Sequence, residues 1–392
     1  MTIMKRLWRR KLNWLITVLT LSLAMAGSDV DAATFSQERA AATNTTSASI
    51  FDTVWALPVL YSDKSNPVVQ RLALIGRYHG QYYTVNADEF GSDSGWDNRR
   101  TRVGIKADLL RIVSFEGQMN IDVDDNRSGF FDSVEDLYID IKPSGAFGLS
   151  IGKHKPYLTH EWNTSSNRIK TIERSLLVNQ IAPDKIYGVT AFGKGGGMIW
   201  RGAVFSGTYT DRWKLPDFDG GYLINASLGC DMGKKGQVRL DYLYNDGDRR
   251  NFVATKPYEH SLSLNYNGTF GRLGLTTDLI YAAGSGEVPD VWGIVLMPYY
   301  KFTDKLEGVF RYTYADSDGR NGIRLANRYE RQVDNLKADR GDNYHSIYTG
   351  ANYYIYGDKL KLMAGVEYST ADLMDGSDWN SWTWFGGVRL HF

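Results

Sequence analysis

The chain has 392 residues, with 45 basic and 45 acidic side chains, so its formal net charge is zero. This balance gives no support to nucleic-acid binding, which depends on a basic surface. The single cysteine, Cys230, excludes an internal disulfide and a cysteine-based metal cluster.

Residues 1–32 have the pattern of a secretory signal peptide. Basic residues between Lys5 and Lys11 precede an apolar run from Leu15 to Ala26, and small-residue cleavage sites end at Ala26 and Ala32. A retained membrane anchor is the alternative, but a spanning helix needs about 20 apolar residues. Cleavage after Ala32 leaves 40 basic and 43 acidic side chains. We therefore expect an exported protein.

Residues 33–70 are expected to form a periplasmic lead-in. The first part is rich in Ala, Thr and Ser, a composition typical of disordered segments. Ile50 to Leu60 can form a short helical or extended segment that packs against the first strand. The barrel itself is predicted for residues 71–392, as one domain.

From Arg71 onward, apolar and polar residues alternate with the period of a β-strand. In the stretch from Arg100 to Leu109, Val103 and Ile105 lie on one face while Arg102 and Lys106 lie on the other. Such a strand meets an apolar medium on one side and water on the other. The high content of glycine and tyrosine, 40 and 25 residues, also favours extensive sheet.

Aromatic residues and connection lengths favour a transmembrane barrel over a soluble sandwich. Many apolar faces end in Tyr or Trp, as an interfacial girdle requires. Tight turns alternate with longer polar links, among them Asn86 to Asn98, Ala315 to Tyr344 and Thr370 to Ser381. The connections divide the chain into about sixteen strands. The predicted fold is all-β, a 16-stranded antiparallel transmembrane β-barrel in contact with outer-membrane lipid.

One connection is different in kind. Between a strand ending near Gly152 and the next at Tyr187, about thirty residues lack strand alternation, which is far longer than an ordinary connection. This link contains six basic residues and three acidic ones, Glu161, Glu173 and Asp184. We expect it to fold inward as a constriction loop.

The candidate pore-lining and anion-binding residues follow from this assignment. Rings of Arg and Lys at a narrow point select anions, and guanidinium groups hold oxyanions through two hydrogen bonds. The candidates from the wall and the loop are Arg77, Arg100, Arg102, Lys106, Lys153, Lys155, Arg168, Lys170 and Arg174. Wall charges also have a structural interpretation, in which they pair across neighbouring strands. Likewise, Arg174 can pair with Glu173 or Glu161 and fix the loop to the wall.

The last strand carries a further signal. Trp384, Val388, Leu390 and Phe392 share its apolar face, and Phe392 is the final residue. This ending resembles the one that the bacterial barrel-assembly machinery reads in outer-membrane proteins.

Several motifs resemble the phosphate-selective porin O and P family. They are Arg99 to Gly104, Ile151 to Pro156, Ser165 to Asn167, Thr171 to Leu176 and the ending Gly387 to Phe392. The resemblance implies a sixteen-stranded, homotrimeric channel of the bacterial outer membrane that passes small anions such as phosphate. Phosphate-selective members have strongly basic lumens, whereas acidic residues such as Glu116 and Asp140 share this predicted wall.

The predicted function is therefore a porin, a passive diffusion channel for small hydrophilic solutes with an anion preference. A general, non-selective porin is the alternative. A barrel enzyme is a remote one, since it needs Ser, His and an acid at one rim, and only His160-Glu161 beside Ser165-Ser166 qualifies. The six histidines have no metal-ligand spacing, and we expect no catalytic residue, metal or cofactor.

Overall fold

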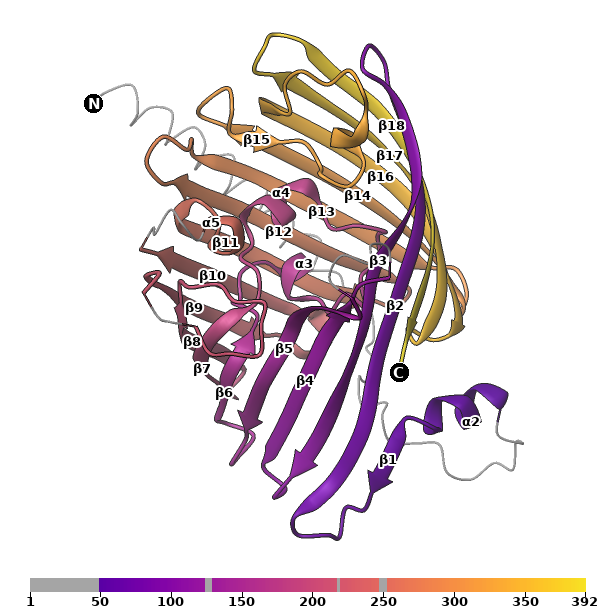
Figure 1. Cartoon of the computed structure of the whole chain (residues 1–392), viewed down its shortest axis with the longest axis vertical. Coiled ribbons are helices and arrows are strands. Elements are labelled where there is room, and N and C mark those ends of the chain that lie inside the picture. Colours follow the sequence, from indigo (N-terminus) through magenta and orange to yellow (C-terminus); the bar gives the residue numbers. More distant parts are fainter. Residues whose placement is uncertain (1–48, 124–128, 217–218, 247–251) are drawn as a thin grey trace.

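A computed structural model describes residues 49–123, 129–216, 219–246 and 252–392. The predicted signal peptide and the first part of the lead-in lie outside the described residues. In the described part, sheet predominates over a few short helices (Figure 1). No helix in these ranges is long and apolar enough to cross a membrane.

The elements follow one another along the chain in a fixed order. The first half contains α2 (Ile50–Ala56), β1 (Val59–Ser62), β2 (Val69–Ala87), β3 (Gly91–Leu109), β4 (Val113–Ile121), β5 (Phe131–Ile141), β6 (Gly148–His154), α3 (His160–Asn163), α4 (Leu176–Ile181), β7 (Ile186–Gly195), β8 (Met198–Ser206), β9 (Tyr222–Asp231) and the 3-10 turn η2 (Gly233–Lys235). The second half contains β10 (Gln237–Asn245), α5 (Phe252–Thr255), β11 (Tyr258–Phe270), β12 (Leu273–Gly284), β13 (Val291–Lys301), β14 (Leu306–Ser317), β15 (Ile323–Arg324), the 3-10 turn η4 (Glu330–Gln332), β16 (Arg340–Tyr356), β17 (Leu360–Leu373) and β18 (Asp378–His391).

Sixteen of the described strands form a closed antiparallel barrel, which confirms the predicted fold. Each strand pairs with its neighbour in sequence, and β18 returns to pair with β2, from Arg77 opposite His391 to Ala87 opposite Ser381. The remaining two are short additions: β1 pairs with the start of β2, and β15 pairs with the start of β16. Closure leaves no unpaired sheet edge for lipid to contact.

The strand alternation places apolar side chains outside and polar ones inside. In β9, Tyr222, Ile224 and Leu228 are exposed, whereas the intervening Asn225 and Ser227 are buried. Because successive side chains of a strand point to opposite faces, the exposed apolar set faces lipid. At the closing seam, the backbones of Phe392 and Gly76 exchange two hydrogen bonds of 3.1 Å.

Two of the predicted long links are wrong. The polar stretch from Asn86 to Asn98 is mostly strand, with only residues 88–90 between β2 and β3, and residues 374–377 alone separate β17 from β18. In the first case Ser92 and Ser94 pair opposite Asn86 and Thr84 of β2. The strands continue beyond the apolar belt, where water contacts both faces and a polar composition no longer signals a loop.

Gly152 allows the sheet to lead into the long connection after β6. Its φ of +125° is one that residues with a side chain rarely adopt, and a Cβ there would lie 2.2 Å from the carbonyl oxygen of Leu137. We therefore expect Gly152→Ala to lower the free energy of unfolding by about 1–3 kcal/mol, from backbone strain alone.

Urea titration of the barrel in detergent micelles measures this loss. Gly202→Ala is the matched control, because a Cβ at Gly202 of β8 has no other atom within 4 Å. Equal stability of the two variants would contradict the prediction.

Candidate functional site

Residues 155–185, the connection between β6 and β7, lie inside the barrel. The carboxylate of Asp278 on β12 accepts hydrogen bonds from the backbone N–H groups of His160 and Glu161, at 2.5 and 3.0 Å. Lys361 on β17 donates to the carbonyl of Ile169, and Arg389 on β18 donates to that of Ile172, both at 2.9 Å. Asp278, Lys361 and Arg389 are buried side chains on the inner face of the wall. We call residues 155–185 the inner segment.

The ends of the inner segment are built by local signals in the sequence. Pro156 lacks an N–H group and lies two residues after His154, the last residue of β6. Thr159 caps α3 by accepting a hydrogen bond from the N–H of Trp162, and Ser175 caps α4 in the same way with Val178. These caps define where the two helical turns of the inner segment begin.

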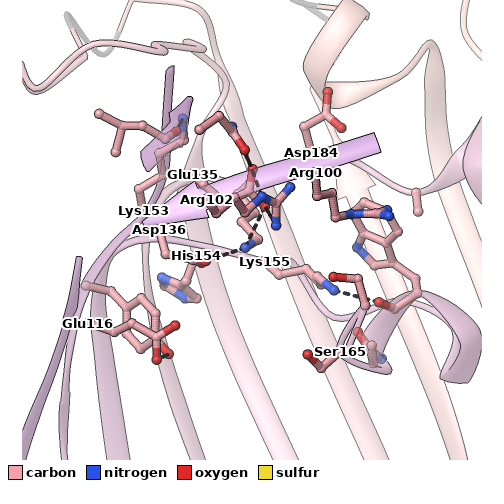
Figure 2. A pocket seen from close by; sticks show the side chains of 18 of the residues that line it. Arg100, Arg102, Glu116, Glu135, Asp136, Lys153, His154, Lys155, Ser165 and Asp184 are labelled. Carbon is pink, nitrogen blue, oxygen red and sulfur yellow. Dashed lines mark hydrogen bonds and ion pairs between the residues drawn. The ribbon is translucent and has the colours of Figure 1, made fainter. Parts of the chain in front are cut away.

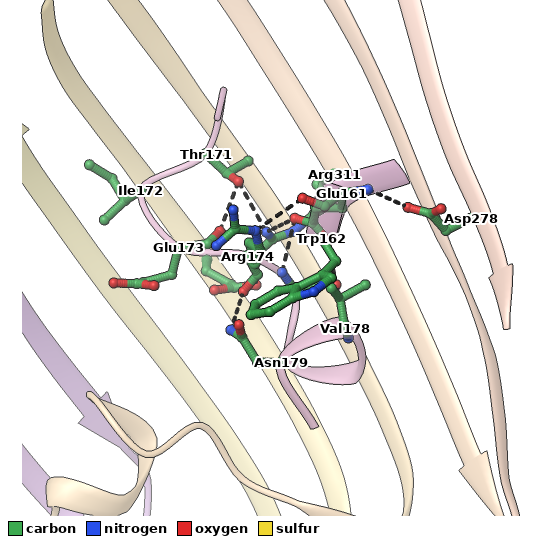
Figure 3. A network of polar contacts seen from close by, with 12 residues as sticks. Glu161, Trp162, Thr171, Ile172, Glu173, Arg174, Val178, Asn179, Asp278 and Arg311 are labelled. Carbon is green, nitrogen blue, oxygen red and sulfur yellow. Dashed lines mark hydrogen bonds and ion pairs between the residues drawn. The ribbon is translucent and has the colours of Figure 1, made fainter. Parts of the chain in front are cut away.

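Arg311 of β14 holds the middle of the inner segment (Figure 3). Its guanidinium donates to the Glu161 carboxylate at 3.1 Å and to the Glu173 carbonyl at 2.7 Å, and on its other side to the Glu367 carboxylate at 3.0 Å. The Arg311 side chain is only 1% exposed. A buried guanidinium between two carboxylates satisfies charges that would be costly to leave unpaired.

Part of the barrel interior is dry, which the sequence did not predict. Leu177 and Ile181 of α4 belong to one buried apolar cluster with wall residues such as Leu223, Leu243 and Val291. These wall positions lie on the inner face. The inner segment therefore packs against β9, β10 and β13 as a core element does. The open space lies on its other side.

The open space is a cavity of about 640 Å³ between the inner segment and strands β2 to β8 (Figure 2). Ten basic and five acidic side chains line it. Six of the nine predicted site residues are among them: Arg77, Arg100, Arg102, Lys153, Lys155 and Arg174. The excess of positive charge makes this cavity attractive to anions.

Some of these cations are neutralised by carboxylates. Arg102 and Lys185 share Glu135, at 2.9 and 2.8 Å, and Lys185 also contacts Asp136 at 2.5 Å. Arg99 pairs with Glu173 at 2.6 Å. These pairs shape the wall but leave little net charge for a solute.

Other cations of the cavity have no carboxylate partner among the described residues. They are Arg77, Arg100, Lys153, Lys155, Arg174 and Arg201. Arg77 donates to the hydroxyl of Ser166, and Arg201 stacks on the ring of Tyr157, 4.1 Å from its centroid. Lys153 donates to the carbonyls of Val134 and Thr210, at 2.6 and 2.7 Å. Uncompensated charges of this kind are the ones available to an incoming anion.

Two cations of the inner segment hold its own backbone. Arg174 donates to the carbonyls of Glu161 and Thr164, at 3.0 and 2.7 Å, and Lys155 donates to that of Trp162 at 2.7 Å. Burial lowers the pKa of Lys155 well below its usual range, and the nearby Arg174 charge lowers it further. Of the predicted partners for Arg174, Glu161 is contacted through its carbonyl, whereas the Glu173 carboxylate binds Arg99 and Gln81.

The structure does not bring all nine predicted residues together. Arg168 and Lys170 line a second cavity of about 60 Å³ on the other side of the inner segment. There Lys170 donates to both carboxylate oxygens of Glu307, at 2.9 and 2.8 Å. Lys106 is half-exposed, pairs with Glu116 at 3.3 Å and does not line the main cavity.

Sequence reasoning missed Arg99 because the alternation of β3 is interrupted. The β2–β3 register shifts between His79 and Gln81, which pair with Arg100 and Asp97 respectively. Strict alternation would direct Arg99 and Arg100 to opposite faces. The shift allows both to line the cavity.

The residues of the remote catalytic alternative separate in the structure. His160 lines the small cavity, whereas Ser165 and Ser166 line the large one. Glu161 is bound by Arg311 and by the hydroxyl of Ser175, at 3.1 and 2.6 Å. Within the described ranges, no group of three His, Cys, Asp or Glu side chains could hold a metal ion.

A second segment reaches the same cavity from the rim of the barrel that lies opposite α2 (Figure 1). Residues 318–339, between β14 and β16, contribute Arg328, which lines the cavity and pairs with Asp97 at 3.0 Å. Gln180 of the inner segment donates to the Gly322 carbonyl and accepts from the Arg324 N–H. These contacts tie the loop to the inner segment.

Arg311 provides a direct test of how the inner segment is held. Arg311→Ala leaves Glu161 and Glu367 buried without their cation, which we expect to cost about 3–5 kcal/mol of docking free energy. The freed segment should raise both the single-channel conductance and its fluctuations. Bilayer recordings measure both quantities.

Arg311→Lys is the companion variant, because it keeps the charge and loses the two-sided contact. It should lie between the wild type and Arg311→Ala. Lys142→Ala, which removes a half-exposed pair with Asp140, is the control for loss of a charge. Unchanged recordings for Arg311→Ala would refute the anchoring role.

We expect the buried Glu330 to make the packing of residues 318–339 dependent on pH. Its fully buried carboxyl accepts hydrogen bonds from Tyr344, Ser369 and the Ala326 N–H. Burial raises its pKa to about 7, and the nearby Glu367 charge contributes to the increase. The packed loop therefore holds a proton that the released loop gives up, so packing weakens between about pH 4.5 and pH 7 and then levels off.

We expect Glu330→Gln, which stays neutral, to abolish this dependence. The measurement is the ratio of proteolytic cleavage rates within residues 318–339, wild type over variant, at pH 5.5 and pH 8. The protease's own pH dependence cancels in the ratio, which should rise with pH. Glu287→Gln, at an exposed position, is the control. A ratio that stays constant with pH would contradict the expected pH dependence of packing.

Comparison with known proteins agrees with this geometry. The sequence model of the phosphate-selective porin O and P family matches residues 73–218, and thereby confirms the family resemblance over that part of the chain. No curated protein matches the chain.

Solved structures share the fold at low sequence identity. OmpF of Salmonella typhi, in complex with daunomycin, has a TM-score of 0.58 at 13% identity, covering 85% of this chain and 100% of that one. The outer-membrane channel DcaP of Acinetobacter baumannii has a TM-score of 0.55 at 13% identity, with the same coverage. A trimer form of OmpT of Vibrio cholerae has a TM-score of 0.51 at 13% identity, covering 82% and 99%. With the family match, the barrel is located in the bacterial outer membrane, as the sequence predicted.

Proposed function

We propose that this chain, which matches the phosphate-selective porin model over residues 73–218, is an outer-membrane porin that passes small anions in preference to cations. The family match and the barrel fold support a channel rather than an enzyme. The anion preference is supported by one observation in particular. The main cavity carries ten basic side chains against five acidic ones, and several of the basic ones have no carboxylate partner in the described part of the chain.

The mechanism follows from how the inner segment divides the lumen. Its packing against the later strands leaves solutes the side lined by β2 to β8, where the uncompensated cations lie. An anion that leaves bulk water there gains attraction from Arg77 and Arg100 without displacing an ion pair. In a partly dehydrated passage each charge acts more strongly than on an open surface. Attraction spread over several side chains still lets the ion leave.

Phosphate is the anion that we propose as preferred. Guanidinium groups bind its oxygens through paired hydrogen bonds, and Arg77, Arg100 and Arg201 line one cavity. We also propose a homotrimer. The trimer form of the structurally similar OmpT supports this assembly.

A general, non-selective porin is the second candidate. It is favoured by the acidic residues in the same cavity, Glu116, Glu135, Asp136, Asp140 and Asp184. The two candidates differ in the sign and size of the reversal potential between salt solutions of unequal concentration.

Replacing two of the uncompensated cations should change selectivity without enlarging the passage. We expect Arg77→Gln/Arg100→Gln to lower the chloride-to-potassium permeability ratio on the order of twofold to tenfold, because two charges are lost from a partly dehydrated passage. Reversal potentials in asymmetric potassium chloride measure the ratio. Inhibition of the chloride current by added phosphate, weakened in the variant, would support a phosphate site.

Arg168→Gln/Lys170→Gln is the matched control, because it removes two charges that line the small cavity. It should leave the ratio near the wild-type value. A wild-type ratio close to one would favour the non-selective porin. A control that loses as much selectivity as the test variant would place the anion route on the other side of the inner segment.

A further inference from the structure

The short helix α2 is firmly attached to the barrel at the rim of short turns. Trp55 Nε1 donates to the carbonyl of His391 at 2.6 Å, and Tyr356 donates its hydroxyl to Asp52 at 2.5 Å. The rings of Phe51 and Trp55 lie 5.5 and 5.1 Å from that of Tyr356. Ser49 and Asp52 form a capping box at the helix start.

This attachment lies on the outer side of the wall. Tyr356 pairs with Leu360, and Leu360 has the same orientation as Leu362, which is 47% exposed. The intervening Lys361 is fully buried in the lumen. Since side chains alternate along β17 and paired residues share a face, Tyr356 and the helix on it lie on the side that faces lipid.

The helix keeps a second apolar surface that no described residue covers. Ile50, Val54 and Leu57 recur at intervals of four and three, which places them on one side of the helix, and they are 74%, 46% and 73% exposed. Asp52 and Ala56 lie on the opposite side, and both are exposed. The exposed stripe adjoins the Phe51–Trp55 side, so one broad apolar arc is half docked and half free.

We propose that α2 is an interfacial membrane anchor, whose stripe of Ile50, Val54 and Leu57 inserts into the periplasm-facing leaflet of the outer membrane. The occupant is lipid because the stripe continues the outer face of the wall, which already contacts lipid. Short turns mark the periplasmic rim of such barrels. An amphipathic helix that lies in the interface buries its apolar side about 5–10 Å into the headgroup and acyl boundary. This role goes beyond conduction of solutes.

Continuity extends through the next element. β1 pairs antiparallel with the start of β2, where β18 has already ended, and Tyr61 lies opposite the outward-facing Leu72. Leu60 and Leu74 are exposed here as well. The lead-in therefore adds apolar surface to the lipid-facing side of the closing seam.

The test uses the full mature chain folded into phospholipid vesicles. Val54→Cys in a Cys230→Ala background carries an environment-sensitive fluorophore, and vesicles with brominated acyl chains quench it on contact. Ala56→Cys, exposed on the opposite side of the helix, is the matched control, and Leu362→Cys on the lipid-facing wall is the positive control. Gel migration of unheated samples verifies that every variant is folded.

We expect brominated lipid to lower the Val54 signal about twofold, as for Leu362, with the Ala56 signal largely retained. A Val54 signal that behaves like that of Ala56 and is quenched by aqueous iodide would overturn the proposal. Shielding of Val54 from both quenchers would also overturn it, because protein would then cover the stripe. Energy transfer between labelled protomers would identify a second copy, and its absence would point to residues 33–48.

Discussion

The arrangement of the lumen depends on the buried guanidinium of Arg311. It joins the inner segment, through Glu161 and Glu173, to the wall, through Glu367. Burying any of these charged groups without its partner would be costly, because no opposite charge would then offset its loss of hydration. Together they fix a segment of about thirty residues in one place, and that place determines where solutes can pass.

Docking of the inner segment divides the barrel into two unlike halves. On the side of the later strands, wall charges such as Asp278 and Lys361 form hydrogen bonds with the backbone of the inner segment. Aliphatic side chains fill the remaining space there. On the side of β2 to β8, cations remain without carboxylates. The selectivity of the passage thus depends less on the total number of charges than on which charges the inner segment leaves unused.

The sequence contained enough information for the fold but only part of the site. Strand alternation identified the barrel, because the two faces meet different media. It failed between Asn86 and Asn98, where both faces meet water. It placed Arg100 and Arg102 in the lumen but missed Arg99, because a register shift is not visible in a single sequence. The length of the connection identified the inner segment, but not which of its residues line each cavity. That Arg168 and Arg174 line different cavities follows from a tertiary fold that no local pattern encodes.

The sequence separation of the anchors has a consequence for folding order. The inner segment precedes β7, but the groups that hold it are far along the chain: Arg311 lies 150 residues beyond Glu161, and Arg389 lies 217 beyond Ile172. Contacts between residues this distant form late, because the intervening chain must first be closed into a loop. A nascent barrel that lacks β17 and β18 has no Lys361, Glu367 or Arg389 to complete these contacts, so the passage acquires its final shape only when the last hairpin arrives. The wall and the passage are therefore completed in the same step. A protein truncated at its C-terminal end would have neither a closed wall nor a fully shaped passage.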